Sequence, residues 1–197
     1  EIHQSGRDFH AETAEAISLA FQDEPVTYDW VVEHKEDEAY KIRYLAKRVN
    51  HASAYRMGPF KATEVINGEA DDTGITVTVS QMKEAQRLWR EKYFGIKGWW
   101  DDIDRILSNT RTLETPYGRV RTFYGWMGDH LKKEATAYVP QSTSVDYLNR
   151  GMLRVYHELV RPKKFGLELL HQNHDSILVE YPAHNRDQVF PFIIELL

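Results

Sequence analysis

Four polar side chains recur at every fourth position between residues 43 and 55. They are Arg43, Lys47, His51 and Tyr55. In a helix of about 3.6 residues per turn, this spacing keeps them on one side over a rise of roughly 18 Å. A core-facing helix carries apolar residues at such a spacing, so this row faces something other than a core. Two cations one turn apart can hold successive phosphates, and an aromatic ring further along can pack on a base or a sugar. The alternative is a basic face covered by water.

A second group that can do chemistry is the pair His174 and Asp175. The pair lies between two apolar-rich runs, 167–173 and 176–181, which predict a two-stranded hairpin. A carboxylate at a hairpin tip can reach into a cleft and bind Mg²⁺, although aspartate in a tight turn often serves only the turn. With His171 the pair would also permit a separate metal-dependent hydrolase, but we expect alternate strand faces to keep these side chains apart.

The elements that must position these groups are mainly helices in the first part of the chain. Apolar residues at helical spacing predict helices over 11–21, 38–57, 80–94 and 99–107. Gly58 and Pro59 are expected to end the second helix, and Ser80 to be the N-cap of the third. A turn-rich loop is expected over 66–74. The run 75–79 alternates like a short extended segment, or leads into the next helix.

The second part of the chain is expected to complete an α+β fold. The stretch 112–124 predicts a hairpin. Two helices are expected to follow, over 128–137 and 141–160. Pro140 is acceptable in the first turn of the second of these helices. After the His174 hairpin, a last helix is expected to be interrupted or restarted by Pro191.

Five segments of the chain resemble, in order, the motifs of family A (polymerase-I-like) DNA polymerases, with a phage-type member as one option. The polar row resembles the family's Arg-x3-Lys-x3-aromatic-x3-Tyr-Gly fingers helix. The other four segments are Gly-x-Asp-x-His-x-x-Thr-Ala at 6–14, Thr-x-x-Gly-Arg-x-Arg at 115–121, Gln-x-Thr at 141–143 and most of Gln-x-His-Asp-Glu at 172–176. Five motifs in the family's order are more specific than any single motif. The resemblance implies mainly helical fingers followed by part of a palm with an antiparallel hairpin.

The resemblance implies a DNA-directed DNA polymerase, which transfers a nucleotide from a dNTP to a primer 3′-OH by a two-metal mechanism. It places Arg43 and Lys47 on the dNTP triphosphate, with Lys47 as catalytic proton donor to the leaving pyrophosphate. His10 would lie near the phosphates and Tyr55 beside the nascent base pair. His51 stands where the family has a residue that packs on the sugar, and an imidazole can stack there. For His10 the alternative is a capping or core histidine.

Contacts to primer–template DNA are implied for five further residues. Gln141 and His174 would hydrogen-bond in the minor groove, where acceptors common to every base pair report geometry and not sequence. Arg119 and Arg121 are expected on phosphates, although exposed hairpin arginines are often merely solvated. Gln141 can equally cap a helix. Arg56 replaces the family's glycine after Tyr55, and is expected beside the template.

Asp175 takes the position of a palm carboxylate that binds catalytic Mg²⁺. The glutamate that follows it in the family is Ser176 here, and a neutral hydroxyl does not replace a charged ligand. The family's other metal-binding aspartate belongs to an Asp-x-Ser-x-x-Glu strand, which nothing before Gly6 matches. We therefore expect the second carboxylate ligand to lie outside this chain.

The resemblance divides the chain into a fingers-like region ending in a hairpin, 1–125, and a partial palm, 126–197. No segment of the chain matches the family's Asp-x-Ser-x-x-Glu strand (motif A), its thumb or its exonuclease. Because the chain begins at Glu1 and ends on an apolar run, we expect a segment that needs the remainder of the polymerase polypeptide and is inactive alone. The alternative is a non-catalytic module, derived from this family, that binds nucleic acid or nucleotide.

Composition bounds these readings. The chain has 197 residues, 42% hydrophobic, which is enough to build a core. The net charge of −5 argues weakly against a nucleic-acid binder, but basic clusters on an acidic body can still follow a phosphate backbone. No stretch is apolar for long enough to span a bilayer, and there is no cysteine. We expect no membrane partner and a location in the cytoplasm of a bacterial or phage-infected cell, with an organelle as the alternative.

Overall fold

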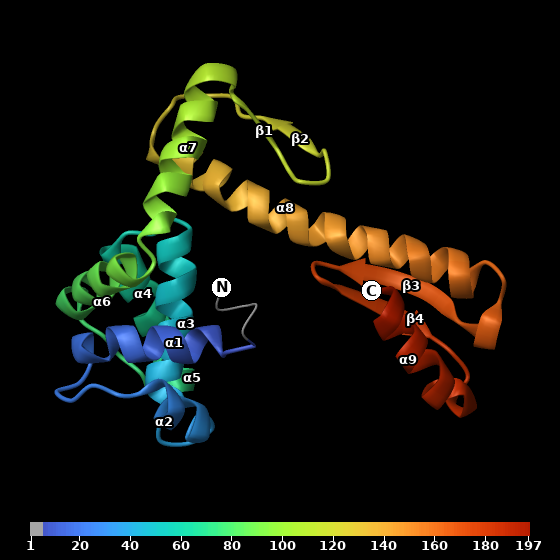
Figure 1. Ribbon diagram of the computed structural model, residues 1–197, viewed down its shortest axis with the longest axis horizontal. Coiled ribbons are helices and arrows are strands. Elements are labelled where there is room, and N and C mark those ends of the chain that lie inside the picture. The colour runs from blue at the N-terminus through green and yellow to red at the C-terminus, as the bar shows by residue number, and fades with distance from the viewer. Residues whose placement is uncertain (1–5) are drawn as a thin grey trace. The chain divides into compact units, whose positions relative to one another are not determined.

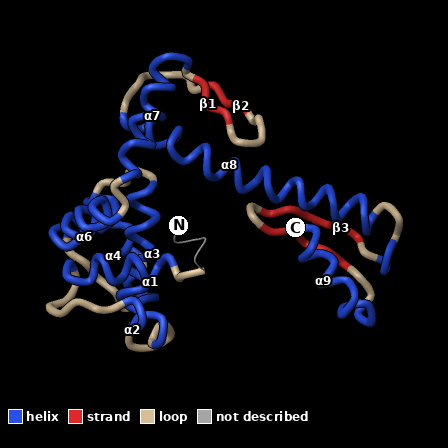
Figure 2. The backbone as a smooth tube through the Cα atoms, in the orientation of Figure 1, coloured by secondary structure: helices blue, strands red, loops and turns tan. Residues whose placement is uncertain are grey.

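Helices dominate the computed structural model, which describes residues 6–197 (Figure 1, Figure 2). These residues divide into two compact units. The first contains the chain as far as Ser108 together with Met127–Thr136, and the second contains Asn109–Trp126 together with Ala137–Leu197. Because helices are joined by two small antiparallel hairpins, the α+β fold expected from the sequence is confirmed.

The first unit is helical throughout its described part. Its elements in chain order are α1 (Phe9–Ile17), the 3₁₀ turn η2 (Ser18–Ala20), α2 (Tyr28–Glu33), α3 (Tyr40–Ala54), α4 (Pro59–Gly68), α5 (Ala70–Thr73), α6 (Val79–Lys92) and α7 (Gly95–Thr110). Local chemistry sets several helix starts. Asp8 caps α1 with its carboxylate, and Pro59 occupies the first turn of α4, where its missing N–H has no helical partner to lose. Thr78 and Gln81 form a capping box at the start of α6.

The core of the first unit lies where α3 packs against α1 and α6. Its members are apolar and buried, among them Ala11, Ala14, Ile17, Val31, Leu45, Ala46, Val49, Ile66, Met82 and Trp89. Full burial of one Val or Leu side chain stabilises the fold by about 1.5–3 kcal/mol. On α3 the buried face consists of residues such as Leu45 and Val49, whereas Lys47 and His51 are exposed. The polar row therefore faces away from the core, as its spacing predicted.

The second unit combines two hairpins with helices. Its elements are β1 (Thr112–Glu114), β2 (Val120–Thr122), most of α8 (Asp129–Val155), the π-helical turn η3 (Tyr156–Val160), the 3₁₀ turn η4 (Lys164–Gly166), β3 (Glu168–Asn173), β4 (Ser176–Glu180), the 3₁₀ turn η5 (Ala183–Asn185) and α9 (Arg186–Leu196). In the register of the two pairs, Leu113 lies opposite Arg121, and Asn173 lies opposite Ser176. A small core gathers Val155, Leu159, Leu167, Val189 and Ile193.

Both hairpins lie where the sequence predicted them, but several helix boundaries differ. The helix expected over 38–57 is α3, which ends at Ala54, so Tyr55 lies just beyond the helix and not on it. The loop expected over 66–74 is instead the end of α4 followed by α5. No strand forms over 75–79, since Ile75 and Val77 are buried singly between helices. The N-cap of α6 is Thr78 and not Ser80. The short helix α2 was not predicted.

The helices predicted over 128–137 and 141–160 form one continuous helix, α8, with Pro140 inside it. Proline has no N–H, so Pro140 cannot donate the helical hydrogen bond to the carbonyl of Thr136, four residues earlier. Pro191 likewise lies inside α9 and does not interrupt it. Within residues 6–197, no helix combines the length and the apolar character needed to cross a lipid bilayer.

Candidate nucleotide and nucleic-acid site

The start of α1 is fixed to the first turn of α3 through Asp8. Asp8 Oδ1 accepts hydrogen bonds from the backbone N–H groups of His10 at 2.8 Å and Ala11 at 3.1 Å. Asp8 Oδ2 accepts from Arg43 Nη2 at 2.8 Å and Nε at 3.1 Å. Partial burial acts to raise the pKa of Asp8, but these hydrogen bonds outweigh it and hold the pKa below its ordinary value. The pair therefore sets where His10 stands relative to α3.

A pocket of about 360 Å³ lies between α1 and α3, and we call it the α1–α3 pocket. Its lining residues are Phe9, His10, Lys47, Arg48, Asn50, His51, Ala54 and Tyr55. Four of the five residues predicted to bind the dNTP line it together: His10, Lys47, His51 and Tyr55. The rings of His51 and Tyr55 meet edge to face with centroids 5.0 Å apart. Arg43, the fifth, does not line the pocket and is paired with Asp8.

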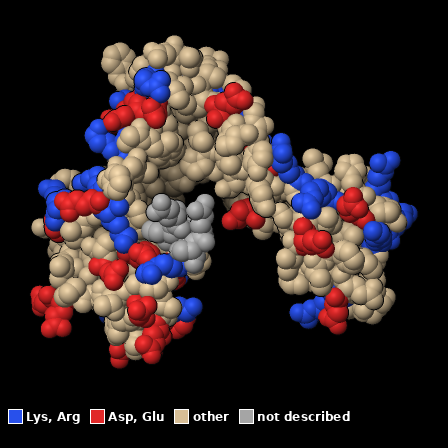
Figure 3. Space-filling model, in the orientation of Figure 1, with Lys and Arg blue, Asp and Glu red and all other residues tan. Residues whose placement is uncertain are grey.

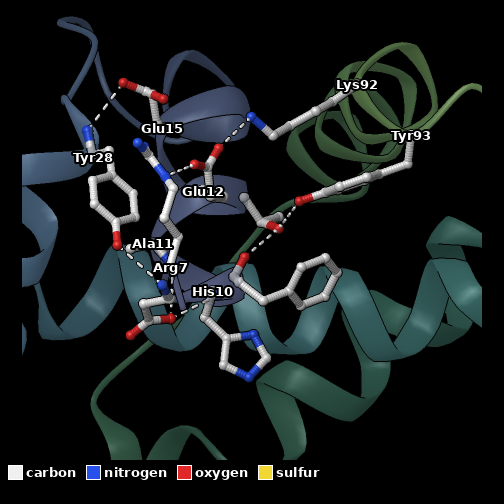
Figure 4. Close-up of polar contacts among 11 residues, drawn as sticks. Arg7, His10, Ala11, Glu12, Glu15, Tyr28, Lys92 and Tyr93 are labelled. Atoms are coloured by element: carbon white, nitrogen blue, oxygen red, sulfur yellow. Dashed lines mark hydrogen bonds and ion pairs between the residues drawn. The ribbon is translucent and has the colours of Figure 1, made fainter. Parts of the chain in front are cut away.

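The surroundings of the pocket lower the pKa of His10 and so favour its neutral form. Burial lowers the pKa of His10, and the positive charges of Arg43 and Lys47 lower it further, against an opposing effect of Asp8. In Figure 4, His10 and Glu12 leave α1 in different directions. Glu12 pairs with Arg7 and with Lys92, whose Nζ lies 2.9 Å from Glu12 Oε2. The charge of Glu12 is thus neutralised away from the His10 ring.

A buried polar residue that the sequence reading missed lies behind the pocket. Asn50 is only 5% exposed, on the buried and mainly apolar face of α3. Its Oδ1 accepts from Trp89 Nε1 at 2.7 Å and from Thr13 Oγ1 at 3.0 Å, and its Nδ2 lies 3.1 Å from His10 Nδ1. An asparagine at an apolar position of an amphipathic helix was the signal available in the sequence, because a buried amide requires partners.

The Arg56 side chain makes its contacts within the first unit. Its backbone has a φ of 59°, a left-handed conformation that glycine adopts without cost. The guanidinium is 15% exposed; Nη1 lies 2.9 Å from Asp104 Oδ1, and Nη2 donates to the Trp100 carbonyl at 2.8 Å. Asp104 Oδ2 also pairs with Lys132 at 2.9 Å. These contacts account for the side chain without DNA, so the template contact stays a prediction.

Asp175 lies in the turn between β3 and β4 in the second unit, and its carboxylate is exposed. His174, also exposed, has a φ of 51°, which closes the turn. Asp175 borders a pocket of about 590 Å³, together with Tyr117, Thr143, Ser144, Tyr147, Leu148 and Leu197. A carboxylate oxygen suits Mg²⁺, but Asp175 is the one acidic residue in this lining. Among residues 6–197 no three His, Asp or Glu side chains gather as a metal site.

The β1–β2 hairpin is held by an ion pair on α8. Arg119 Nε donates to Asp146 Oδ1 at 2.7 Å, and Asp146 Oδ2 accepts from Thr115 Oγ1 at 3.0 Å. The hydrogen bond from Arg119 is the main reason that the pKa of Asp146 lies below its ordinary value. The Arg121 guanidinium lies over the rings of Phe123 and Tyr138, 4.8 and 5.7 Å from their centroids. The phosphate contacts of Arg119 and Arg121 stay predictions.

Gln141 is exposed on α8. Because α8 continues through this position, Gln141 does not cap a helix start, and that alternative was wrong.

Charged groups are distributed unevenly over the first unit. Acidic side chains gather around α2 (Figure 3), where Asp23, Glu24, Asp29, Glu33 and Glu36 are exposed. Basic and acidic groups are mixed on the second unit (Figure 3).

Comparison with known proteins identifies the class to which this fold and these motifs belong. The model of DNA polymerase family A matches residues 1–197, so the chain belongs to that family. It is 24% identical to DNA polymerase I of Helicobacter pylori, over all of this chain and 21% of that protein. It is 25% identical to the thermostable DNA polymerase I of Thermus filiformis, again over 100% of this chain and 21% of that protein. The chain thus spans about a fifth of the length of these relatives.

A solved structure supports the same fold. The POL domain of Pol1 from M. smegmatis, in complex with DNA primer-template and dNTP, superposes with a TM-score of 0.72 at 17% identity. The match covers 98% of this chain and 31% of that chain. A rice relative, the mitochondrial DNA polymerase I B, is 22% identical over all of this chain and 20% of its own length. The family expected from the five motifs is therefore confirmed.

Proposed function

We propose that the protein containing this chain is a DNA-directed DNA polymerase, and that the α1–α3 pocket binds the incoming dNTP. The observation that carries the proposal is the convergence of His10, Lys47, His51 and Tyr55 on one pocket, in a chain that belongs to DNA polymerase family A throughout its length. A cation, a neutral imidazole and two adjacent rings match the phosphates and the sugar and base of a nucleotide. The M. smegmatis relative was solved with primer-template DNA and dNTP, which supports the same partners here.

In the proposed reaction the primer 3′-hydroxyl releases its proton to solvent as its oxygen attacks the α-phosphorus of the dNTP. The new P–O bond forms as the bond from the α-phosphorus to the bridging oxygen breaks, and pyrophosphate leaves with the electron pair. Lys47 donates a proton to that leaving oxygen and neutralises its developing charge. Arg43 supports the triphosphate while paired with Asp8. Primer–template DNA is held by Gln141, His174, Arg119 and Arg121 in this proposal.

Asp175 supplies one carboxylate for Mg²⁺ in this proposal. Bound Mg²⁺ would stabilise the charge on the attacking and leaving oxygens of the in-line displacement. A site for two Mg²⁺ ions needs more oxygen ligands than one carboxylate offers, even with the substrate phosphates contributing. The second ligand is expected from the remainder of the polypeptide. Ser176 offers a hydroxyl that donates to the Asn173 carbonyl at 2.9 Å, and it adds no charge.

Lys47→Ala in the full protein tests the proposal. General-acid catalysis contributes about 10²–10⁴-fold, so we expect kcat for primer extension to fall by about that factor. Lys41→Ala is the matched control, because Lys41 is exposed on the same helix but does not line the α1–α3 pocket. An unchanged kcat in Lys47→Ala would contradict the assigned role.

The second candidate is a non-catalytic module that binds nucleotide or nucleic acid. Ser176, in place of a family carboxylate, is the observation that favours it. The same experiment separates the two candidates. A full protein that binds dNTP but never extends a primer, under any Mg²⁺ concentration, would support the module.

A further inference from the structure

The hydrogen bonds around Asn50 specify which nitrogen of His10 carries a proton. The chain of reasoning begins at Trp89, whose indole N–H can only donate. Trp89 Nε1 lies 2.7 Å from one oxygen or nitrogen position of the Asn50 amide, so that position must be the acceptor Oδ1. Thr13 Oγ1 also lies 3.0 Å from this oxygen, but its single proton has a second acceptor in the Phe9 carbonyl, likewise 3.0 Å away. The indole therefore fixes the orientation of the amide.

The orientation of the amide then fixes the histidine. With Oδ1 turned to Trp89, the NH₂ group of Asn50 is directed at His10 Nδ1, 3.1 Å away. An NH₂ group donates, so Nδ1 must be the unprotonated, accepting nitrogen of the ring. In a neutral imidazole the proton then lies on Nε2. In an imidazolium ion Nδ1 would also carry a proton, and that N–H would face the NH₂ group of Asn50, which is itself a donor. This arrangement therefore also disfavours the imidazolium ion.

The buried setting makes this arrangement strict. Asn50 is 5% and Trp89 is 3% exposed, so water does not readily replace a lost partner for either group. Thr13, fully buried, is itself held by Tyr93, whose hydroxyl lies 2.7 Å from Thr13 Oγ1 (Figure 4). Three helices, α1, α3 and α6, thus contribute to the position of one imidazole. His10 also borders the α1–α3 pocket.

We infer that Asn50 and Trp89 are positioning residues that hold His10 as the Nε2–H tautomer, so that it presents a hydrogen-bond donor to the triphosphate of a nucleotide in the α1–α3 pocket. The second half of this inference rests on the proposed function. A donor fixed before binding needs no rearrangement when the negatively charged ligand arrives, and hydrogen bonds to charged groups are the stronger ones. The opposite tautomer would turn a lone pair toward the phosphates.

The tautomer can be measured directly in the full protein by nitrogen NMR of ¹⁵N-labelled histidine, without nucleotide. His10→Gln identifies the signals of the ring. We expect the wild-type protein to carry the proton on Nε2. In Asn50→Asp the carboxylate can only accept, so the proton should move to Nδ1. In Trp89→Phe the amide is free to rotate, and both tautomers should be populated.

Trp100→Phe is the matched control. Trp100 also donates its indole N–H to α3, at the Ala54 carbonyl 3.2 Å away, but it does not touch Asn50. Its substitution removes an equivalent hydrogen bond and should leave the His10 tautomer unchanged. A proton on Nδ1 in the wild type, or no change in both Asn50→Asp and Trp89→Phe, would overturn the inference.

Nucleotide affinity provides the second readout, measured with dNTP and a primer–template whose 3′ end cannot be extended. We expect Trp89→Phe to weaken binding by about threefold to tenfold, and Trp100→Phe to leave it unchanged. Asn50→Asp is excluded here, because its added charge would repel phosphates by itself. If the tautomers behave as expected but His10→Ala and Trp89→Phe bind dNTP like the wild type, the donor role is overturned while the tautomer assignment stands. Failure of the wild type itself to bind dNTP would overturn the proposed function separately.

Discussion

The α1–α3 pocket and the turn that carries Asp175 differ in how their polar groups are held. Around the pocket, Asp8 fixes Arg43, and buried Asn50 orients His10, so the groups are set before any ligand arrives. At the turn, Asp175 is exposed and is the one acidic group of its pocket. Recognition by several donors can be complete within one compact unit. The turn offers a single carboxylate, so any Mg²⁺ bound there would depend on oxygen ligands from elsewhere.

The sharpest way to break this comparison is Asp175→Asn in the full protein. The amide keeps the shape of the side chain and loses its charge, and loss of a charged metal ligand removes several kcal/mol of transition-state stabilisation. We expect kcat for primer extension to fall by about 10³-fold. Because the turn is exposed, dNTP affinity and the melting temperature should stay nearly unchanged. A large loss of stability would instead mean that Asp175 serves the fold.

The second prediction concerns the cores of the two units. Ile17→Ala in the first and Leu159→Ala in the second each remove a fully buried side chain, at an expected cost of about 2–5 kcal/mol. Hydrogen exchange of backbone amides, measured site by site, should show lost protection mainly in the unit that carries the substitution. Equal loss in both units after either substitution would show that they unfold as one.

The third prediction uses pH. Burial acts to raise the pKa of Glu12, but Lys92 and Arg7 outweigh this effect and keep the pKa below its ordinary value. The folded state therefore favours the carboxylate. The stability that this ionisation contributes is present above the unfolded pKa of about 4.3 and is lost as the pH falls through the lower folded pKa. Glu12→Gln should therefore cost about 1–3 kcal/mol near neutral pH and flatten the loss of stability in acid. Denaturant unfolding across that pH range measures both effects.

Exposed Glu33, on α2, is the control for the acid titration. Glu33→Gln should change stability by less than about 0.5 kcal/mol and leave the pH profile intact. A profile that Glu12→Gln does not alter would show that its pairs with Lys92 and Arg7 add no net stability.

The smallest expected effect is local to the β1–β2 hairpin. Asp146→Asn replaces the charged partner of Arg119 and keeps an acceptor for Thr115. We expect faster hydrogen exchange at the hairpin turn, with the exchange of β3 and β4 unchanged. Slower hydrogen exchange at the hairpin turn would mean that the ion pair between Arg119 and Asp146 destabilises the hairpin.

The sequence predicted the faces of α3, the two hairpins and the family, because each has a local signal. Arg43, Lys47 and His51 follow one helical period, and the His174 turn separates two apolar runs. Boundaries were predicted less well, since capping by Thr78 and the continuity of α8 through Pro140 depend on tertiary packing.

The partners of the polar groups were beyond a reading of local pattern. Nothing near Arg43 in the sequence indicates Asp8, which lies 35 positions earlier. Asn50 bonds Trp89 across 39 positions, and that pairing exists only once α6 packs on α3. Spacing along a helix identifies a face, whereas long-range hydrogen bonds follow from the fold.

The contacts of Arg56 make the residue at position 56 and the residue at position 104 depend on each other energetically. Its left-handed backbone suits the glycine that the family motif carries there, and a non-glycine residue loses roughly 1–2 kcal/mol in that conformation. The contacts to Asp104 and Trp100 offset this loss. Arg56→Gly would relax the backbone but leave Lys132, 2.9 Å away, as the ion-pair partner of Asp104. Positions 56 and 104 are thus energetically coupled, because the cost of replacing Arg56 depends on which residue stands at 104.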